Sequence, residues 1–343
     1  MSKPTIDDVA NLAGVSIKTV SRVVNNEPNV RDSTRSQVES AISQLNYRPN
    51  ISARNLASHR SNLVVLIYDD PSTSTSPNES IAVRLQHGAL QACRQANREL
   101  LIHPCNYRDK SVRPALRSLI ARTRPDGVVI AAPLSNMATI TKPFADAGIP
   151  FVRLSPGRKS TAEFSVGTND RAISAEMTRY LASLGHRDIA FVSGNEQERA
   201  VANRKIGYQE GLSVCGISYR DSLVISGDSS FESGVAAAER LLARKKPPTA
   251  IFAANDCMAA GVMQTAQKKG LRLPSQLSIA GFDDSTLAKY LNPSLTTIQQ
   301  PLAKMAESAV SALLSNRDEH DRPKGMTVIP SVLVLRESTG PVL

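Results

Sequence analysis

Three polar side chains near the start of the chain, Lys18, Ser21 and Arg22, fall on one side of a short helical pattern. Val20 and Val23 fall on the other side of the same segment. Hydrogen-bond donors on the outer face of a short helix are suited to contacts with base edges and phosphates in a DNA major groove. The alternative left open by these residues is a small amphipathic helical hairpin with a solvated basic face.

Two short helices joined by a sharp turn would position that face. Thr5 can cap the first helix, and Asp8, three residues later, can accept in return from the backbone of the cap. Gly14 allows the left-handed backbone that ends a helix and turns the chain. Ser16 can cap the second helix, which carries the donors. The segment is therefore predicted to be a helix-turn-helix.

A third helix is expected to start at a cap on Asp32 or Ser33 and to run to about Leu45. Its apolar residues recur at helical spacing and form one stripe. Three short helices around one small core would complete a DNA-binding module over residues 1–46.

Residues 47–61 are predicted to form a hinge helix or linker. Pro49 stops the preceding segment, and Asn50 can cap a helix of roughly two turns. A helix shorter than about 12 residues is marginal in water, so this one would be ordered only when DNA and a second copy hold it. A plain interdomain linker is the alternative.

The composition is ordinary for a soluble globular protein, with 343 residues, 41% hydrophobic and 21% charged. The formal net charge of +10 favours a polyanionic partner. The longest apolar runs, such as Leu63–Ile67 and Val128–Ala132, are too short to cross a bilayer, and the N-terminus does not resemble a signal peptide. Four widely spaced cysteines without a CxxC motif indicate reduced thiols. We therefore expect a cytoplasmic protein with no membrane partner.

From Leu63 onward, short apolar runs alternate with helical segments. This alternation predicts parallel sheets with helices on both faces, and about 280 residues exceed one core, so two lobes are expected.

Ligands of open parallel sheets bind at the carboxyl ends of the strands. The side chains that follow predicted strands are acids and an amide: Asp69, Asp70, Asn255, Asp256, Asp283 and Asp284. Such groups, with an arginine, suit a polyhydroxylated ligand, because each can pair two neighbouring hydroxyl groups. Alternatively, they cap the helices that follow, which is the expected role of Asp256.

Sequence motifs of enzymes are missing from the chain. It has no GxGxxG, no P-loop and no HExxH motif, and its five histidines are scattered. We therefore expect no catalytic residue, no metal site and no cofactor. A stand-alone sugar-binding or sensor protein is a second alternative, against which the helix-turn-helix argues.

The N-terminal residues resemble a known family. Thr5–Ala10 (TIDDVA), Ala13–Ser16 (AGVS), Thr19–Val23 (TVSRV) and Tyr47–Asn50 (YRPN) are similar to the DNA-binding module of the LacI/GalR (lactose-repressor) family of transcription regulators. The resemblance continues over almost the whole chain. It implies a small all-α helix-turn-helix domain followed by an α/β effector domain of two lobes, built like a periplasmic binding protein.

This resemblance implies that Ile17, Lys18 and Arg22 occupy base-reading positions. Arg22 suits guanine, because a guanidinium can bridge O6 and N7, and Lys18 suits guanine or a phosphate. Ile17 either contacts a thymine methyl group or packs in the core. Leu56 would be a wedge that two paired hinge helices insert into the minor groove. Ser16, Thr19, Ser21 and Asn25 are candidate phosphate contacts, and Thr5, Asn50, Ala53 and Arg54 complete the predicted DNA-binding set.

Four stretches of the larger part match places where family members bind their effectors: Arg204–Gly207, Ala254–Asp256, Gly281–Asp284 and Leu295–Ile298. The predicted effector-binding residues are Asp69, Asp70, Arg204, Phe231, Asn255 and Asp283. Ser229 stands where relatives often present an aromatic ring that stacks on the ligand, and Phe231 is its candidate replacement.

The expected domains are a helix-turn-helix at 1–46, a hinge at 47–61 and an effector domain at 62–343. By the resemblance, the chain crosses between lobes near residues 160–166, 289–293 and 322–326. The N-lobe is then about 62–162 with 291–324, and the C-lobe about 163–290 with 325–343.

We expect a homodimer that binds pseudopalindromic double-stranded operator DNA. It would repress carbohydrate-utilisation genes under the control of a mono- or disaccharide effector. A regulator that uses a nucleobase co-repressor is the further alternative.

Overall fold

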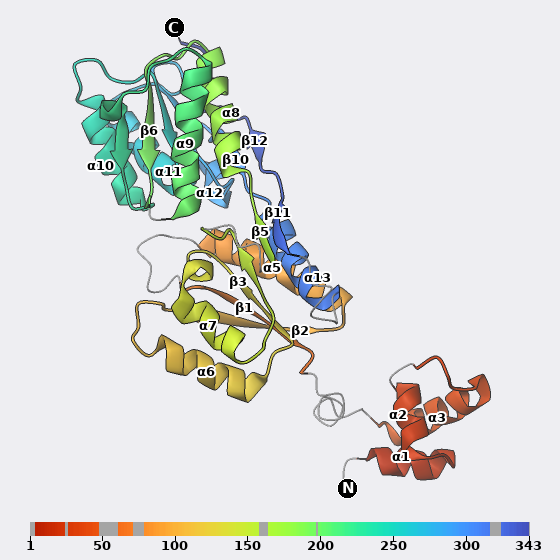
Figure 1. The fold of residues 1–343 in the computed structure, drawn as a ribbon. Helices are drawn as coiled ribbons and strands as arrows, with labels where there is room; N and C mark the ends of the chain where they lie inside the picture. The colour runs from red at the N-terminus through yellow and green to blue at the C-terminus, as the bar shows by residue number, and fades with distance from the viewer. Residues whose placement is uncertain are drawn as a thin grey trace. The chain divides into compact units, whose positions relative to one another are not determined.

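The computed structural model describes residues 4–24, 27–47, 61–70, 79–157, 164–196, 198–315 and 324–342 (Figure 1). The chain divides into two compact units, Met1–Ser61 and Asn62–Leu343. Five residues of the predicted DNA-binding set lie outside the described residues: Asn25, Asn50, Ala53, Arg54 and Leu56. The predicted hinge at 47–61 also lies outside them, except for its first and last residues.

The first unit is a three-helix module. Its helices are α1 (Ile6–Ala13), α2 (Ile17–Val24) and α3 (Asp32–Leu45). The Thr5 hydroxyl accepts from the Asp8 backbone N–H at 3.3 Å, and the Asp8 carboxylate accepts from the Thr5 N–H at 2.8 Å, so the expected capping box is present. Gly14 ends α1 with a φ of 60°, a conformation that L side chains rarely adopt.

The start of α3 differs from the prediction. Arg31 occupies the N-cap position without a side-chain hydrogen bond, and Asp32 is already the first helical residue. The Asp32 carboxylate in the first turn still interacts favourably with the helix dipole. The small core of the unit is made of buried side chains from all three helices: Val9, Ala10, Ala13, Val20, Val23, Val38 and Ala41.

The first lobe of the larger unit contains a six-stranded parallel sheet in the order β11-β5-β4-β3-β1-β2. Its strands are β1 (Leu63–Asp69), β2 (Glu99–Cys105), β3 (Gly127–Ile130), β4 (Phe151–Leu154), β5 (Phe164–Gly167) and β11 (Gly325–Val328). Helices α5 (Glu79–Gln95) and α13 (Leu302–Ser315) cover one face, and α6 (Val112–Thr123) and α7 (Ala138–Asp146) cover the other. A short 3-10 helix, Leu134–Asn136, precedes α7.

Helices α5 and α13 approach each other closely at Gly88. A Cβ atom at this position would lie 1.9 Å from the backbone oxygen of Ala303. Only glycine is compatible with this packing. The close approach fixes α13, which belongs to a late part of the chain, against the first lobe.

The second lobe is built around a four-stranded parallel sheet in the order β7-β6-β8-β9. Its strands are β6 (Ile189–Ser193), β7 (Val224–Ser226), β8 (Ala250–Ala253) and β9 (Ser278–Ala280), next to the antiparallel pair β10 (Thr297–Gln299) and β12 (Val332–Val334). Its helices are α8 (Asp170–Ser183), α9 (Arg199–Val214), α10 (Phe231–Leu242), α11 (Asp256–Lys268) and α12 (Thr286–Tyr290), with a 3-10 turn at Asp221–Leu223. Helix α8 packs against α9, and α10 packs against α11.

The crossings between lobes come later in the chain than the predicted lobe boundaries. Strands β5 and β11 were expected in the second lobe, but they pair with each other and with β4 in the sheet of the first lobe. Strand β10 was expected in the first lobe, but Thr296, just before it, pairs with Ala280 in the second. The apolar runs show that strands exist, but strand pairing is a tertiary property that their composition does not encode.

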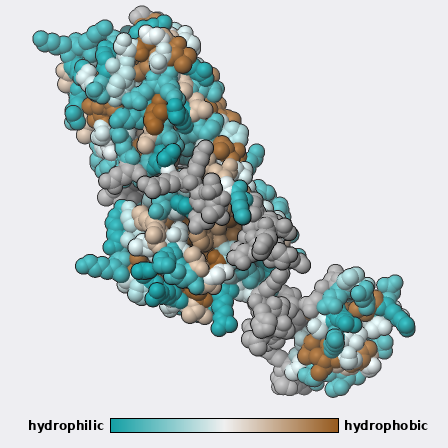
Figure 2. Space-filling model, viewed as in Figure 1, coloured by the Kyte–Doolittle hydropathy of each residue, from teal (hydrophilic) through white to brown (hydrophobic). Residues whose placement is uncertain are grey.

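Figure 2 shows a mostly hydrophilic surface with small apolar patches on the visible face. In the described ranges, no helix is both long enough and apolar enough to span a bilayer.

Candidate DNA-reading face and effector cavity

The outer face of α2 presents three predicted base-reading residues to solvent. Ile17, Lys18 and Arg22 are exposed, whereas Val20 and Val23 are buried. Ile17 is 47% exposed, so it lies on the outer face rather than in the core. An apolar side chain in this position is available for a thymine methyl group.

Local hydrogen bonds stabilise the start of α2 and leave its outer face exposed to solvent. The Ser16 hydroxyl accepts from the Thr19 N–H at 3.2 Å and lies 2.9 Å from the Thr19 hydroxyl. Arg22 Nε is 3.6 Å from a Glu27 carboxylate oxygen, and both side chains are about half exposed. An exposed ion pair of this kind contributes little, so Arg22 can leave Glu27 for a nucleic acid at small cost.

A cavity of about 440 Å³ lies in the larger unit, where the carboxyl ends of the strands of the two lobes face each other. Its polar lining includes Tyr68, Asp69, Tyr107, Arg108, Asn195, Glu198, Arg204, Asp228, Asn255, Asp283 and Gln300. The structure thus brings together four of the six residues predicted to bind an effector: Asp69, Arg204, Asn255 and Asp283. This volume is in the usual range for a small-molecule site.

Three lining residues of the second lobe, Arg204, Asn255 and Asp283, form a polar floor of this cavity, and Arg204 on α9 is at its centre. Its Nε donates to Asp170 at 3.2 Å, and its guanidinium also donates to the Ala254 carbonyl at 2.6 Å. A carboxylate oxygen of a second acid, Asp283, lies 3.8 Å from Arg204 Nη1. The centroid of the Phe282 ring lies 3.6 Å from the guanidinium carbon. These contacts fix the plane of the guanidinium, which suits recognition of paired oxygen atoms.

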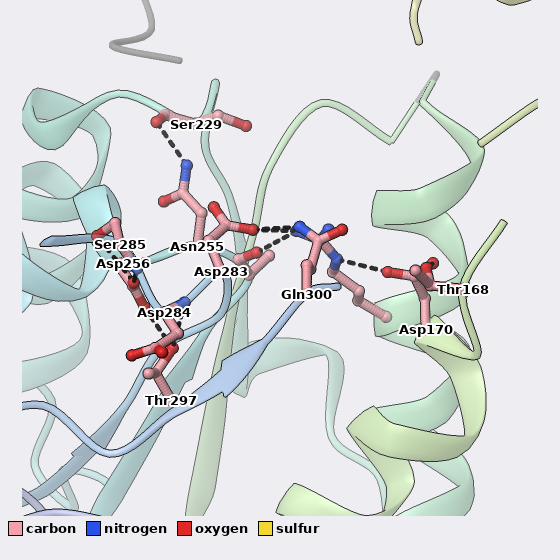
Figure 3. A network of polar contacts seen from close by, with 12 residues as sticks. Thr168, Asp170, Ser229, Asn255, Asp256, Asp283, Asp284, Ser285, Thr297 and Gln300 are labelled. Atoms are coloured by element: carbon pink, nitrogen blue, oxygen red, sulfur yellow. Dashed lines mark hydrogen bonds and ion pairs between the residues drawn. The ribbon is translucent and has the colours of Figure 1, made fainter. Parts of the chain in front are cut away.

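Asp283 is held in a strained backbone conformation. Its φ is 117°, in a region that favours glycine. Its carboxylate accepts from Gln300 Nε2 at 2.5 Å (Figure 3). Its carbonyl accepts from Arg84 of α5 at 2.7 Å. Burial raises the pKa of Asp283, and the Arg204 charge opposes this rise. The segment that contains Asp283 is therefore held by groups from both lobes.

Asn255 is fixed at both ends of its amide. The side-chain oxygen caps α11 by accepting from the Met258 N–H at 2.8 Å. The side-chain nitrogen donates to the Ser229 carbonyl at 2.8 Å (Figure 3). One amide thus orients both the start of α11 and the loop before α10.

Asp256 and Asp284 have structural contacts and do not line the cavity. Asp256 accepts from the Ser285 N–H and hydroxyl and from the Thr297 hydroxyl, while Asp284 pairs with Arg336. The expectation that Asp256 caps the following helix is wrong, because the N-cap of α11 is Asn255; Asp256 instead binds Ser285 and Thr297.

Two residues predicted to bind an effector do not line the cavity. Asp70 lies just beyond the end of β1 and is not part of the lining. Phe231 lines a separate shallow hollow with Met263 and Tyr290. As the first residue of α10, it points toward α11 and α12, so it does not replace the missing aromatic ring at Ser229.

Several lining residues were not predicted, notably Tyr107, Arg108 and Glu198. They follow the carboxyl ends of β2 and β6, so the strand-end rule could have found them, although it was not applied to these positions. In the described part of the chain, no group of His, Cys, Asp or Glu side chains is placed to hold a metal ion.

Two family models match the chain. Residues 5–50 match the lacI family of bacterial regulatory proteins, and residues 178–339 match the periplasmic binding protein-like domain. The HTH-type transcriptional regulator DegA of Bacillus subtilis is 34% identical over 345 residues, which cover 99% of both chains. The chain belongs to the LacI family.

Solved structures of LacI-family regulators have the same architecture. A lac repressor dimer bound to operator and the anti-inducer ONPF is 28% identical, with a TM-score of 0.81, over 99% of this chain and 100% of that one. The regulator CelR in complex with cellobiose is 29% identical, with a TM-score of 0.74, over 98% and 99% of the two chains. The prediction of a helix-turn-helix domain and a two-lobed effector domain is confirmed, and the chain is a DNA-binding transcription regulator rather than an enzyme.

Proposed function

We propose that this LacI-family regulator is a cytoplasmic homodimer that represses carbohydrate-utilisation genes, and that a mono- or disaccharide in the cavity controls its binding to the operator. The observation that carries the proposal is the fixed set of Arg204, Asn255 and Asp283 on the floor of the 440 Å³ cavity. A planar guanidinium, an amide and a carboxylate in fixed positions can pair the adjacent hydroxyl groups of a sugar. The cellobiose complex of CelR supports the same ligand class.

Each protomer would read one half of a pseudopalindromic operator. Arg22 contacts guanine, Lys18 contacts guanine or a phosphate, and Ile17 contacts a thymine methyl group. Ser16, Thr19 and Ser21 contact phosphates and set the position of α2. The predicted hinge contacts, with Leu56 as the minor-groove wedge, complete the interface.

Control follows from the position of the cavity between lobes. A ligand that contacts both lobes favours one angle between them, and it shifts the equilibrium only if it binds the two states with different affinity. A change of lobe angle in both protomers would change the spacing of the two hinge segments, and thereby the affinity for operator DNA.

A thermal-shift screen of mono- and disaccharides, repeated with operator DNA selected from a random duplex pool, tests the ligand class. We expect at least one neutral or aminated sugar to raise the melting temperature and to change operator affinity. Adenine and guanine belong in the same screen. A response to a nucleobase alone would overturn the sugar assignment and leave the DNA-binding role intact.

Arg22→Ala tests the DNA-reading face. It should weaken operator binding by about 1–3 kcal/mol and relax the preference at one base pair of each half-site. Arg35→Ala, on α3 of the same module, is the control for loss of charge. An equal loss for Arg22→Ala on random DNA would show that Arg22 contacts only phosphate.

A further inference from the structure

The lining of the effector cavity is acidic, although the chain as a whole carries a formal charge of +10. The charged lining residues are four acids and two arginines: Asp69, Glu198, Asp228, Asp283, Arg108 and Arg204. The site therefore has two more carboxylates than guanidinium groups. A buried charge is stable only when it is paired, so this imbalance limits the charge of any ligand that fills the cavity.

Most of these charges are already engaged within the protein. Arg204 lies between Asp170 and Asp283, so its charge is shared by two carboxylates. Asp228 accepts from the Ser230 N–H at 2.9 Å and from its hydroxyl. Arg108 lies over the Tyr107 ring, 4.5 Å from its centroid.

Asp69 and Glu198 differ from the other acids of the lining. Asp69 is the last residue of β1 in the first lobe, and Glu198 is the N-cap of α9 in the second. Among the residues that the structure describes, Asp69 Oδ1 is buried with no hydrogen-bond partner, and the Glu198 carboxylate forms no ion pair or hydrogen bond. Two carboxylates with free acceptor capacity thus contribute to one cavity from opposite lobes.

Neither of these two carboxylates forms an ion pair within the described residues, although Arg108 and Arg204 lie near enough to affect their pKa. Burial raises the pKa of Asp69, and the nearby Arg108 opposes this only in part. Burial also raises the pKa of Glu198; Arg204 opposes the rise, and the negative charge of Asp69 adds to it. The two acids therefore repel each other across the cavity, and a positive group between them would relieve this repulsion.

We propose that the effector is a polyhydroxylated molecule with a protonated amine, that is, an amino sugar, and that Asp69 and Glu198 together bind its ammonium group. This inference rests on the proposed function of the cavity as a sugar site. An ammonium has three donors and no acceptor, so it can satisfy both carboxylates at once, with charge-assisted hydrogen bonds. Arg204, Asn255 and Asp283 remain available for the hydroxyl groups.

The same arrangement excludes anionic ligands. A uronate or sugar phosphate would bring a further negative charge to Asp69 and Glu198, in a lining whose carboxylates already outnumber its guanidinium groups. An amine shared by the two lobes would also favour the state in which Asp69 and Glu198 are close together. This gives the ligand the difference in affinity between states that regulation requires.

A series of sugars with one ring and different charge tests this inference on the full-length chain. The probes are glucosamine, glucose, glucuronate and glucose 6-phosphate, the corresponding galactose series, and cellobiose beside the β-1,4-linked dimer of glucosamine. Calorimetric titration at about pH 6.5, where a primary amine of this kind is mostly protonated, gives each affinity. We expect an amine to bind about tenfold more tightly than its neutral counterpart, and the anions to show no binding.

Two variants connect the preference to the proposed pair. Glu198→Gln and Asp69→Asn should each reduce the ratio of amine to neutral affinity by about tenfold. Glu196→Gln is the matched control, because Glu196 is two residues from Glu198 but pairs with Lys205 and does not line the cavity. This control should keep the wild-type ratio.

The outcomes separate the inference from the proposed function. Tighter binding of a neutral or anionic sugar than of its amine would overturn the inference and leave the sugar site in place. An amine preference that survives both Glu198→Gln and Asp69→Asn would also overturn it. If no sugar of any charge binds or changes operator affinity, both the inference and the proposed sugar effector are wrong.

Discussion

The two lobes of the larger unit contribute different chemistry to one cavity. The first lobe supplies mainly apolar walls, from Ile81 and Leu85 of α5, Leu154 of β4, and Leu302 and Met305 of α13. The second lobe supplies a polar floor, in which Arg204, Asn255 and Asp283 have fixed partners. The second lobe can thus orient a ligand through its polar groups, while the first lobe shapes the cavity with apolar side chains.

Arg204→Ala should have the largest effect, because it removes the centre of the polar floor. Asp170 and Asp283 would remain buried without their cation, at a cost of about 3–5 kcal/mol in the free energy of unfolding. Chemical denaturation measures this cost. Arg171→Ala, on the neighbouring helix, breaks the exposed pair with Glu210 and should cost less than about 1 kcal/mol. Equal costs for the two variants would contradict a special role for the polar floor.

Leu302→Ala tests the apolar wall of the first lobe. The Leu302 side chain is 5% exposed, so its truncation should cost about 2–5 kcal/mol in unfolding free energy. Ligand affinity should fall, but the order of preference among sugars of different charge should not change. Val83→Ala on α5 is the control, because Val83 is 60% exposed and should cost less than about 0.5 kcal/mol. A changed charge preference in Leu302→Ala would remove the proposed division between the lobes.

Asn255→Ala separates the structural role of a polar-floor residue from its role in binding. Loss of the cap of α11 should cost about 1 kcal/mol. Ser230→Ala removes the cap of α10 at a similar cost, since Ser230 accepts from the Ser233 N–H at 3.1 Å. Only Asn255→Ala should also weaken ligand binding in calorimetry. If both variants weaken it equally, the orientation of helices rather than the amide determines affinity.

The smallest expected effect is a pH dependence from the second lobe. His186 is buried, with ring nitrogens 2.9 Å from the Thr249 and Ser278 hydroxyl groups, and burial lowers its pKa. Below about pH 6.5 the unfolded chain therefore takes up a proton that the folded chain does not. The free energy of unfolding consequently decreases as the pH is lowered. The loss should be at most about 1 kcal/mol between pH 8 and pH 6. Denaturation of His186→Gln over this range should show a smaller dependence, and an unchanged dependence would assign it elsewhere.

The sequence predicted those features that depend on local order. The capping box of Thr5 and Asp8 and the turn at Gly14 involve residues three or four positions apart, so their geometry follows from the helix itself. The rule that ligands bind at strand ends placed Asp69 and Asp283 correctly on the lining of one cavity.

Other features depend on tertiary packing, and the sequence did not predict them. Phe231 was expected in the cavity but lies in a separate hollow, because the direction of its side chain is set by the packing of α10 on α11. Glu198 and Arg108 follow the carboxyl ends of β6 and β2, so the strand-end rule could have included them, but it was not applied there. Strands β5 and β11 of the first sheet were assigned to the other lobe, because an apolar run does not specify its partner.

The central claim is that ligand occupancy of the cavity controls operator binding. Fluorescence anisotropy of a labelled operator, titrated with the full-length chain at fixed salt with and without the sugar found by screening, tests it most directly. The account predicts a change in operator affinity of about tenfold or more in the wild-type chain, and no ligand effect in Asp283→Ala, whose ligand-free operator binding is unchanged. A sugar that binds the cavity while operator affinity stays the same would contradict the account.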